Sequence, residues 1–342
     1  IAFRQVLLSY FNSEKLTLIF SGIIFSSPVL IYYADTLLPD VFSFASLLLS
    51  ASYFYRYVQT NKLIHWLVFT IFLAIAVLIK ITALVALLSF VGAFFFYSLH
   101  QANRAYWQDR RMWFGYLALF LVLVLTIWWY RYAIAYNTKH HSHIFSTTIR
   151  PIWEVDTATR WRIIRLIWEE HLKEIMHPIL LVSLLLALSA LAIKGKISLF
   201  FRYWIPVALV GLSAYFILWF WVFEVHDYYF IEVLFFPLTI VALIFQNTRA
   251  YLQNQSFGKW ILATGLTFIF LNTVSFTQVA AGNQNIIVEK TSFSSKKIKD
   301  IWGWFYFNHQ EGLQQLQEQT PALQRLIAPT DTVFCFSDPY PN

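Results

Sequence analysis

The sequence contains a single cysteine, Cys335, among 342 residues. One cysteine cannot form a disulfide within the chain, and it excludes a cysteine-based metal site. Charged residues are also scarce, because they make up 13% of the chain against about a quarter of a soluble domain. Hydrophobic residues reach 58%. This balance indicates a protein that faces lipid.

Nucleotide-binding signatures are missing as well. We find no Gly-rich phosphate loop, no Walker or Rossmann fingerprint and no internal repeat. Cytosolic nucleotide chemistry is therefore not expected on this chain. The net charge of +7 could suggest nucleic-acid binding, but the basic residues stand in short clusters between apolar runs. That pattern is typical of membrane topology, so we expect the lipid bilayer as a partner and no nucleic acid.

The two ends of the chain also lack expected features. The sequence starts at Ile1 with no signal-peptide pattern, and it stops at "SDPYPN", just after a strand-like run. We expect a fragment that is cut at both ends.

Long apolar runs, by contrast, are abundant. A helix needs about 20 apolar residues to cross the hydrocarbon layer. Nine runs are candidates for such spans: 16–33, 41–57, 63–79, 81–99, 113–132, 178–193, 203–223, 229–245 and 260–278. Only Lys80 separates the third run from the fourth. Together they hold about 37 residues, more than one tilted helix can use, so we predict two spans with a tight turn at Lys80.

The charges in the connections predict the orientation of these spans. One set of connections holds the basic residues Arg56, Lys62, Arg104, Arg110, Arg111, Lys194, Lys196, Arg202, Arg249 and Lys259. The alternate set is "ADTLLPD" (34–40), Lys80 and "EVHDY" (224–228), with four acids and one lysine. By the positive-inside rule the basic set is cytoplasmic. The acidic connections, the loop 133–177 and the tail 279–342 are then external.

The fold that we predict is an all-α polytopic membrane protein with about nine transmembrane helices in residues 1–278. The loop 133–177 is expected to add an external interfacial helix. The tail 279–342 contains a helix-like stretch and the strand-like "TVFCFSD", so it is predicted to be the incomplete start of a small external α/β domain. The expected location is a bacterial inner membrane.

The interfacial helix is predicted from the segment "TRWRIIRLIWEEHLKEIM" in the loop 133–177. Its helical period places apolar residues on one face: Trp161, Ile164, Trp168, Leu172 and Ile175. The opposite face carries Arg162, Arg165, Glu169 and Lys173. A helix of this kind lies in the interface plane. It serves either as a structural element or as a lid over a site.

The same loop holds a cluster of three histidines, His140, His141 and His143. A divalent metal site is conceivable there, but the cluster has no clear carboxylate or thiolate partner. We interpret it as a solvated loop and assign no metal ligands. No cofactor is firmly implied.

Ionisable residues in or near spans are costly and usually mark function. Asp35 and Asp40 stand in "YYADTLLPD". Asp40 could cap the helix that follows Pro39, or either acid could line a cavity at the external mouth. Lys80 stands alone in "VLIKITAL". It suits an anionic group at headgroup depth, such as a lipid phosphate, or it is a lysine that snorkels to the interface.

The third candidate region is "FEVHDYYF", where two apolar runs meet without a turn residue. Tyr228 and Tyr229 fit an aromatic belt. That explanation does not cover Glu224, His226 and Asp227. An imidazole and two carboxylates on one wet rim suit a hydroxyl-rich ligand, phosphate contacts or proton transfer.

Taken in order, the segments "YYADTLLPD", "LIKITALV" and "VHDYYF" resemble motifs of the polyprenyl-phosphate-dependent membrane glycosyltransferases of the C-type fold. This family includes the protein O-mannosyltransferases and the lipid A aminoarabinose transferases, in particular bacterial members. The resemblance spans roughly residues 16 to 342. It implies a donor sugar carried on a polyprenyl phosphate, with Lys80 as the contact to the lipid phosphate and Tyr228 or Tyr229 on the same rim.

The family's main catalytic acids lie in a first external loop that has no counterpart before the run 16–33. We therefore expect two N-terminal spans and the main acid to be missing, so that the catalytic residue is unknown, with Asp35 and Asp40 as the candidates here. The chain as given is expected to be inactive. The expected reaction is sugar transfer to an acceptor hydroxyl of a lipid, glycan or protein that the sequence does not identify. The alternatives are a secondary transporter and a non-catalytic membrane assembly protein.

Overall fold

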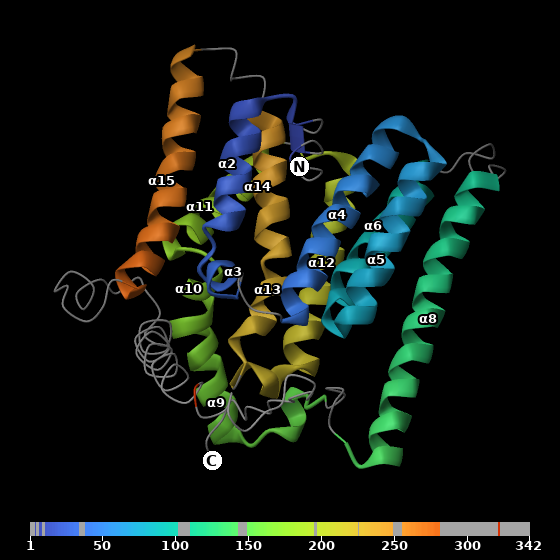
Figure 1. Cartoon of the computed structure of the whole chain (residues 1–342). Coiled ribbons are helices and arrows are strands. Elements are labelled where there is room, and N and C mark those ends of the chain that lie inside the picture. Colours follow the sequence, from blue (N-terminus) through green and yellow to red (C-terminus); the bar gives the residue numbers. More distant parts are fainter. Residues whose placement is uncertain are drawn as a thin grey trace.

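The structure is a computed structural model that describes residues 4, 7, 8, 11–33, 38–101, 110–142, 149–194, 197–224, 226–248, 255–280 and 321. Nearly all of these residues are helical, and no strand occurs among them. The longer helices run roughly side by side (Figure 1). This part of the predicted fold class, an all-α chain, is confirmed for the described residues.

The helices follow the apolar runs of the sequence. They are α2 (Glu14–Phe25), α3 (Pro28–Tyr33), α4 (Pro39–Thr60), α5 (Leu63–Ile79), α6 (Leu84–Gln101), α8 (Arg110–His140), α9 (Thr157–Leu166), α10 (Leu172–Ile175), α11 (Pro178–Ile193), α12 (Leu199–Leu218), α13 (Phe230–Val233), α14 (Phe235–Thr248) and α15 (Gln255–Ala280). Short turns of 3-10 helix are η1 (Ile81–Ala83), η2 (Ile152–Glu154), η4 (Phe220–Glu224) and η5 (Asp227–Tyr229), and η3 (Ile167–His171) is a turn of π-helix.

Three of the described helices are long and apolar enough to cross a membrane: Ile81–His100, Trp113–His140 and Leu199–Leu218. A fourth span is possible if Thr157–Ile175 and Pro178–Ile193, which meet at an angle of 85°, count as one. Three shorter apolar helices lie at Leu63–Ile79, Phe230–Ile244 and Leu262–Thr273. Helices thus occupy the positions of the predicted runs, but fewer than nine have the length and composition of a span.

The predicted span 16–33 is broken in the structure. Helix α2 ends at Phe25, and α3 starts after Ser26 and Ser27, which are both buried. The Ser27 hydroxyl donates to the Ile175 carbonyl at 2.7 Å, and Asn272 Nδ2 donates to Ser26 Oγ at 3.2 Å. These bonds satisfy polar groups at the break and tie it to α10 and α15, so the break is a built feature of the fold.

The tight turn predicted at Lys80 is present. Lys80 is a single extended residue, with φ −141° and ψ 117°, between α5 and η1. Its N–H donates to the Ala76 carbonyl, and its own carbonyl accepts from the Ala83 N–H. The chain therefore reverses with its backbone hydrogen bonds kept.

The predicted loop 133–177 is partly wrong, because α8 continues to His140 instead of ending near 132. No Gly or Pro interrupts residues 133–140, and ring contacts run along the helix from Trp129 through Tyr132 and Tyr136 to His140. These contacts, one helical turn apart, favour continuation of the helix.

A helix is present where the interfacial helix was predicted, as α9, η3 and α10. Asp156 caps its N-terminus, since its Oδ1 accepts from the Thr159 N–H at 3.0 Å, and this backbone donor lowers the pKa of the carboxyl group. The predicted apolar face is divided, however. Trp161 and Trp168 are exposed, whereas Ile175 is buried. The π-turn η3 adds a residue to the helical repeat and so rotates the later positions inward.

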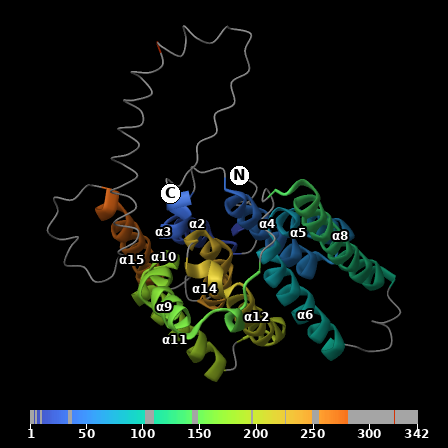
Figure 2. The same ribbon diagram turned by 90° about the horizontal axis from the view of Figure 1, so that it is seen from below.

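The connections between the helices lie toward different ends of the molecule. The α4–α5 turn, the end of α14 and the start of α15 lie at the upper end in Figure 1, while the α5–α6 turn, α13 and α9 lie lower down. Seen from below, α8 lies at the outer edge beside α5 (Figure 2). Of the segments predicted to be external, the α5–α6 turn and α9 thus lie toward the same end of the helices. The tail 279–342, apart from residues 279, 280 and 321, lies outside the described residues, and so does the α/β domain predicted there.

Helices α2 and α15 approach closely at two glycines. A Cβ added at Gly265 would lie 2.4 Å from Ile19 Cγ2, and one added at Gly22 would lie 2.5 Å from Ile269 Cδ1. Small residues allow this approach, as is usual where helices pack within a membrane. The contact holds α15 against the N-terminal helices.

We predict that Gly265→Val destabilises the protein, because the new side chain overlaps Ile19 and must push α15 away. Overpacking of this kind costs about 1–3 kcal/mol. Thermal unfolding of the purified protein in detergent measures the effect. The control is Ala263→Val at an exposed position of the same helix, which should unfold at nearly the wild-type temperature. Equal unfolding temperatures for both variants would contradict the packing argument.

Candidate functional site

A buried ion pair joins two of the predicted site residues. Lys80 Nζ lies 2.5 Å from Asp40 Oδ1. The Lys80 side chain is 13% exposed and that of Asp40 only 1%. Burying both charges is costly unless they neutralise each other at close range, and the short contact provides that neutralisation. The pair connects the first turn of α4 to the turn between α5 and α6.

The two tyrosines of the "VHDYYF" segment cover this ion pair. Lys80 Nζ lies 3.7 Å from the ring centre of Tyr229 and 4.9 Å from that of Tyr228. A cation over aromatic faces is favoured, more so where water is excluded. The rings of Tyr228 and Tyr229 also stack on each other, with their centres 5.1 Å apart. The ring of Tyr33 meets the ring of Tyr228 edge to face, with 5.9 Å between the centres. The predicted convergence of Asp40, Lys80 and the tyrosines is therefore present.

The backbone of the segment places the tyrosines. After α12 the chain turns through η4 and η5 before α13 begins at Phe230. The Tyr215 hydroxyl of α12 donates to the Tyr229 carbonyl at 2.9 Å, within a buried environment. This bond fixes the short turn against α12, and it thereby holds the ring of Tyr229 over Lys80.

Asp40 is not a helix cap, and that predicted alternative is wrong. The N-cap of α4 is Leu38, and no side-chain capping bond is present. Pro39 takes the first helical position, for which its fixed φ is suited, and this places Asp40 inside the first turn. Its carboxylate is then directed to Lys80, while its negative charge near the helix N-terminus is favourable.

Glu224 does not face the ion pair. It pairs instead with Arg162 of α9. Nearby, Arg150 lies over the Trp221 ring at 4.6 Å, and the Trp221 N–H donates to the Arg150 carbonyl. The residues around 150–162 therefore lie against η4, next to the covering tyrosines. Glu224 is better described as a tether between segment 150–162 and the site than as a lining residue.

A buried histidine makes the second connection between these segments. His171 is fully buried, with Nδ1 2.7 Å from Glu174 Oε2 and Nε2 2.8 Å from the Phe223 carbonyl. Its ring nitrogens thus link η3 and α10 to η4. The predicted interfacial helix and the covering segment are joined as one unit, which the sequence did not reveal.

The remaining predicted residues are placed as follows. The His226 ring lies 5.0 Å from Tyr228 and stacks on Tyr229 at 6.1 Å, so it belongs to the aromatic cover. Asp35 and His143 lie outside the described residues, and so does the side chain of Asp227. Among the described residues, no group of three His, Cys, Asp or Glu side chains could hold a metal ion.

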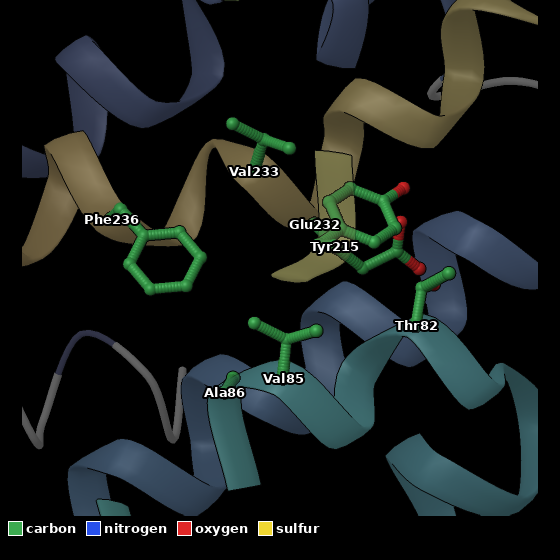
Figure 3. Close-up of a pocket in the computed structure, with 7 residues that line it drawn as sticks. All are labelled: Thr82, Val85, Ala86, Tyr215, Glu232, Val233 and Phe236. Carbon is green, nitrogen blue, oxygen red and sulfur yellow. The ribbon is translucent and has the colours of Figure 1, made fainter. Parts of the chain in front are cut away.

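One charged residue of the site was missed by the sequence reading. Glu232 on α13 is 5% exposed, and neither carboxylate oxygen has a hydrogen-bond partner within the described structure. It lines a small cavity together with Thr82, Val85, Ala86, Tyr215, Val233 and Phe236 (Figure 3). The carboxylate points toward Thr82 in Figure 3, and the Thr82 hydroxyl is likewise buried without a partner there. A glutamate inside the apolar run 229–245 was the signal available.

The site therefore contains one ammonium group within electrostatic range of two buried carboxylates, under an aromatic cover. Lys80 is the cation, while Asp40 and Glu232 supply negative charge from α4 and α13. Such a site can bind an anion through Lys80 only if the lysine separates from Asp40 or contacts Asp40 and the anion at the same time. Alternatively, the carboxylates can accept a proton.

Comparisons with known proteins do not narrow this range of chemistry. Neither a family model, nor a curated protein, nor a solved structure matches the chain.

We predict that Lys80→Met strongly destabilises the protein, because it leaves Asp40 buried and unpaired. Loss of one partner of a buried pair costs about 3–5 kcal/mol. The double variant Asp40→Asn/Lys80→Met removes both charges and should recover most of that loss. Thermal unfolding in detergent of the wild type, both single variants and the double variant gives the coupling free energy. Additive effects of the two single changes would contradict a stabilising pair.

Proposed function

We propose that this protein transfers a sugar from a polyprenyl-phosphate donor to an acceptor hydroxyl at the external face of a membrane. The observation that carries the proposal is the contact of Lys80 with Asp40 under Tyr228 and Tyr229. Three segments that are far apart in sequence, and that resemble the three family motifs in order, meet at one place. Their meeting is what a shared site requires.

The location of the site also supports a lipid-borne substrate. The site lies at the ends of apolar helices, among them Ile81–His100 and Leu199–Leu218. A donor with a polyprenyl chain could keep that chain in the hydrocarbon while its phosphate reaches Lys80. We place the protein in a bacterial inner membrane with about nine spans, oriented by the positive-inside rule with the site external.

In the proposed reaction, the acceptor oxygen attacks the anomeric carbon of the sugar and the bond from that carbon to the phosphate oxygen breaks. The polyprenyl phosphate leaves with the bonding electrons, and the acceptor's proton passes to a carboxylate. Lys80 stabilises the negative charge that develops on the leaving phosphate. Asp40 keeps Lys80 in position before the donor binds. Because the activated phosphate is supplied by the lipid, no nucleotide is needed.

Segment 149–175 would form one wall for the acceptor. It is tied to η4, next to the aromatic cover, by Arg162–Glu224 and by the bond from His171 to the Phe223 carbonyl. An acceptor that approaches from outside must therefore pass this segment. The choice of acceptor would then lie in these residues, and the choice of donor lipid in the Lys80 cluster.

The two alternatives predict different features. A secondary transporter is favoured by broken helices, of which α2–α3 is one, but it is usually built from paired repeats, and the sequence has none. A non-catalytic assembly protein does not require a buried charge cluster. Neither alternative explains why the tyrosine pair covers Lys80.

We expect Asp40→Asn/Lys80→Met to slow sugar transfer strongly while the protein stays folded, since the cation that meets the phosphate is gone. Removing one such electrostatic contact lowers turnover about 10²–10³-fold. The assay uses membranes containing the product of the complete gene and radiolabelled polyprenyl-phosphate sugars.

The matched control is Lys62→Met, which removes an exposed lysine at the opposite end of α5 and should leave transfer unchanged. Transfer at the wild-type rate in the double variant would remove Lys80 from the mechanism. A wild-type protein that transfers no sugar from any polyprenyl-phosphate donor would refute the proposed function itself.

A further inference from the structure

We infer that Glu232 is the proton-carrying group of the phosphate site, taking up one proton from water when an anionic lipid phosphate binds to Lys80. This inference rests on the proposed function. It assigns to Glu232 a role that neither the sequence motifs nor the resemblance supplies.

The first step of the argument is the environment of the carboxylate. Glu232 is only 5% exposed, and both of its carboxylate oxygens lack a hydrogen-bond partner among the described residues. A buried ionised carboxylate without hydrogen bonds is costly. Its ionised form must therefore depend on a nearby cation, or the group must carry a proton.

The second step identifies the cation. Lys80 is within electrostatic range of Glu232 as well as of Asp40. One ammonium group thus serves two carboxylates. Asp40 holds it by direct contact at 2.5 Å, whereas Glu232 attracts it without forming a hydrogen bond. Of the two acids, Glu232 is the one whose charge is less well compensated.

The third step is the arrival of the ligand. A phosphodiester carries one negative charge, and it would bind the same ammonium group. With both acids ionised, three negative charges would then surround one cation in a dry site, where like charges repel strongly. A neutral Glu232 relieves this repulsion. Phosphate binding and protonation of Glu232 are therefore coupled, each favouring the other.

A small cavity gives a proton a route to Glu232, and the other titratable groups nearby are not candidates for carrying it. The cavity beside Glu232 is about the size of one water molecule, and the Thr82 hydroxyl shares it. The other titratable groups in electrostatic range are Tyr215 from α12 and Tyr130 from α8. Free tyrosines ionise only near pH 10, so they stay neutral where a carboxylate changes charge.

The test measures binding of farnesyl methyl phosphate, a phosphodiester whose single charge does not change between about pH 5.5 and 8.5. The complete protein is held in nanodiscs, and farnesol serves as the probe without phosphate. We expect wild-type affinity for the phosphodiester to fall about tenfold per pH unit across the range in which Glu232 loses its proton, as one-proton coupling requires. Farnesol binding should show no such slope.

Glu232→Gln resembles the protonated acid, so its affinity should be independent of pH and at least tenfold above wild type at the alkaline end. Glu232→Asp should keep the slope, and it reports on the carboxylate if the glutamine variant does not fold. The matched control is Glu14→Gln, at the exposed start of α2, which should titrate like the wild type.

Several results would overturn the inference. An unchanged slope in Glu232→Gln would do so, as would a slope that disappears only in Asp40→Asn. A wild-type protein that binds the phosphodiester no better than farnesol would refute the phosphate site, and with it the proposed function. A phosphodiester that binds with no slope in any variant would refute the role of Glu232 alone.

Discussion

The contact between Lys80 and Asp40 is the constraint on which the rest of the site depends. Two charges buried to this degree must stay together, and that requirement fixes the start of α4 against the turn after α5. The tyrosine cover then has a cation to pack on. Glu232 of α13 lies within electrostatic range of the same lysine, so the two carboxylates share one ammonium group.

Much of the fold was accessible from apolar patterning. Helices lie where the runs predicted them, and the reversal at Lys80 was visible because a single charge separated two long runs. The split of 16–33 was less accessible, since Ser26 and Ser27 bond to residues far away in sequence. The division of the predicted apolar face, with Trp161 exposed and Ile175 buried, could not be predicted either, because a π-turn between them leaves the composition of a helix unchanged.

The site divides in the same way. Asp40, Lys80 and the tyrosines were found because each interrupts an apolar run at its edge. Glu232 was missed because it lies within a run, where it was taken as part of a span. Glu224 was misjudged and His171 was missed for another reason. Their partners, Arg162 and the Phe223 carbonyl, are far from them in the sequence. Spacing along the chain does not encode such contacts.

The angle of 85° between Thr157–Ile175 and Pro178–Ile193 has a consequence for how the molecule responds to its surroundings. One arm is bonded to η4, next to the aromatic cover, and the other is an apolar helix. A change in bilayer thickness that tilts the second arm would act as a lever on the first. A change in the composition of the surrounding lipid would change the bilayer thickness. Access to Lys80 would then change even without a ligand.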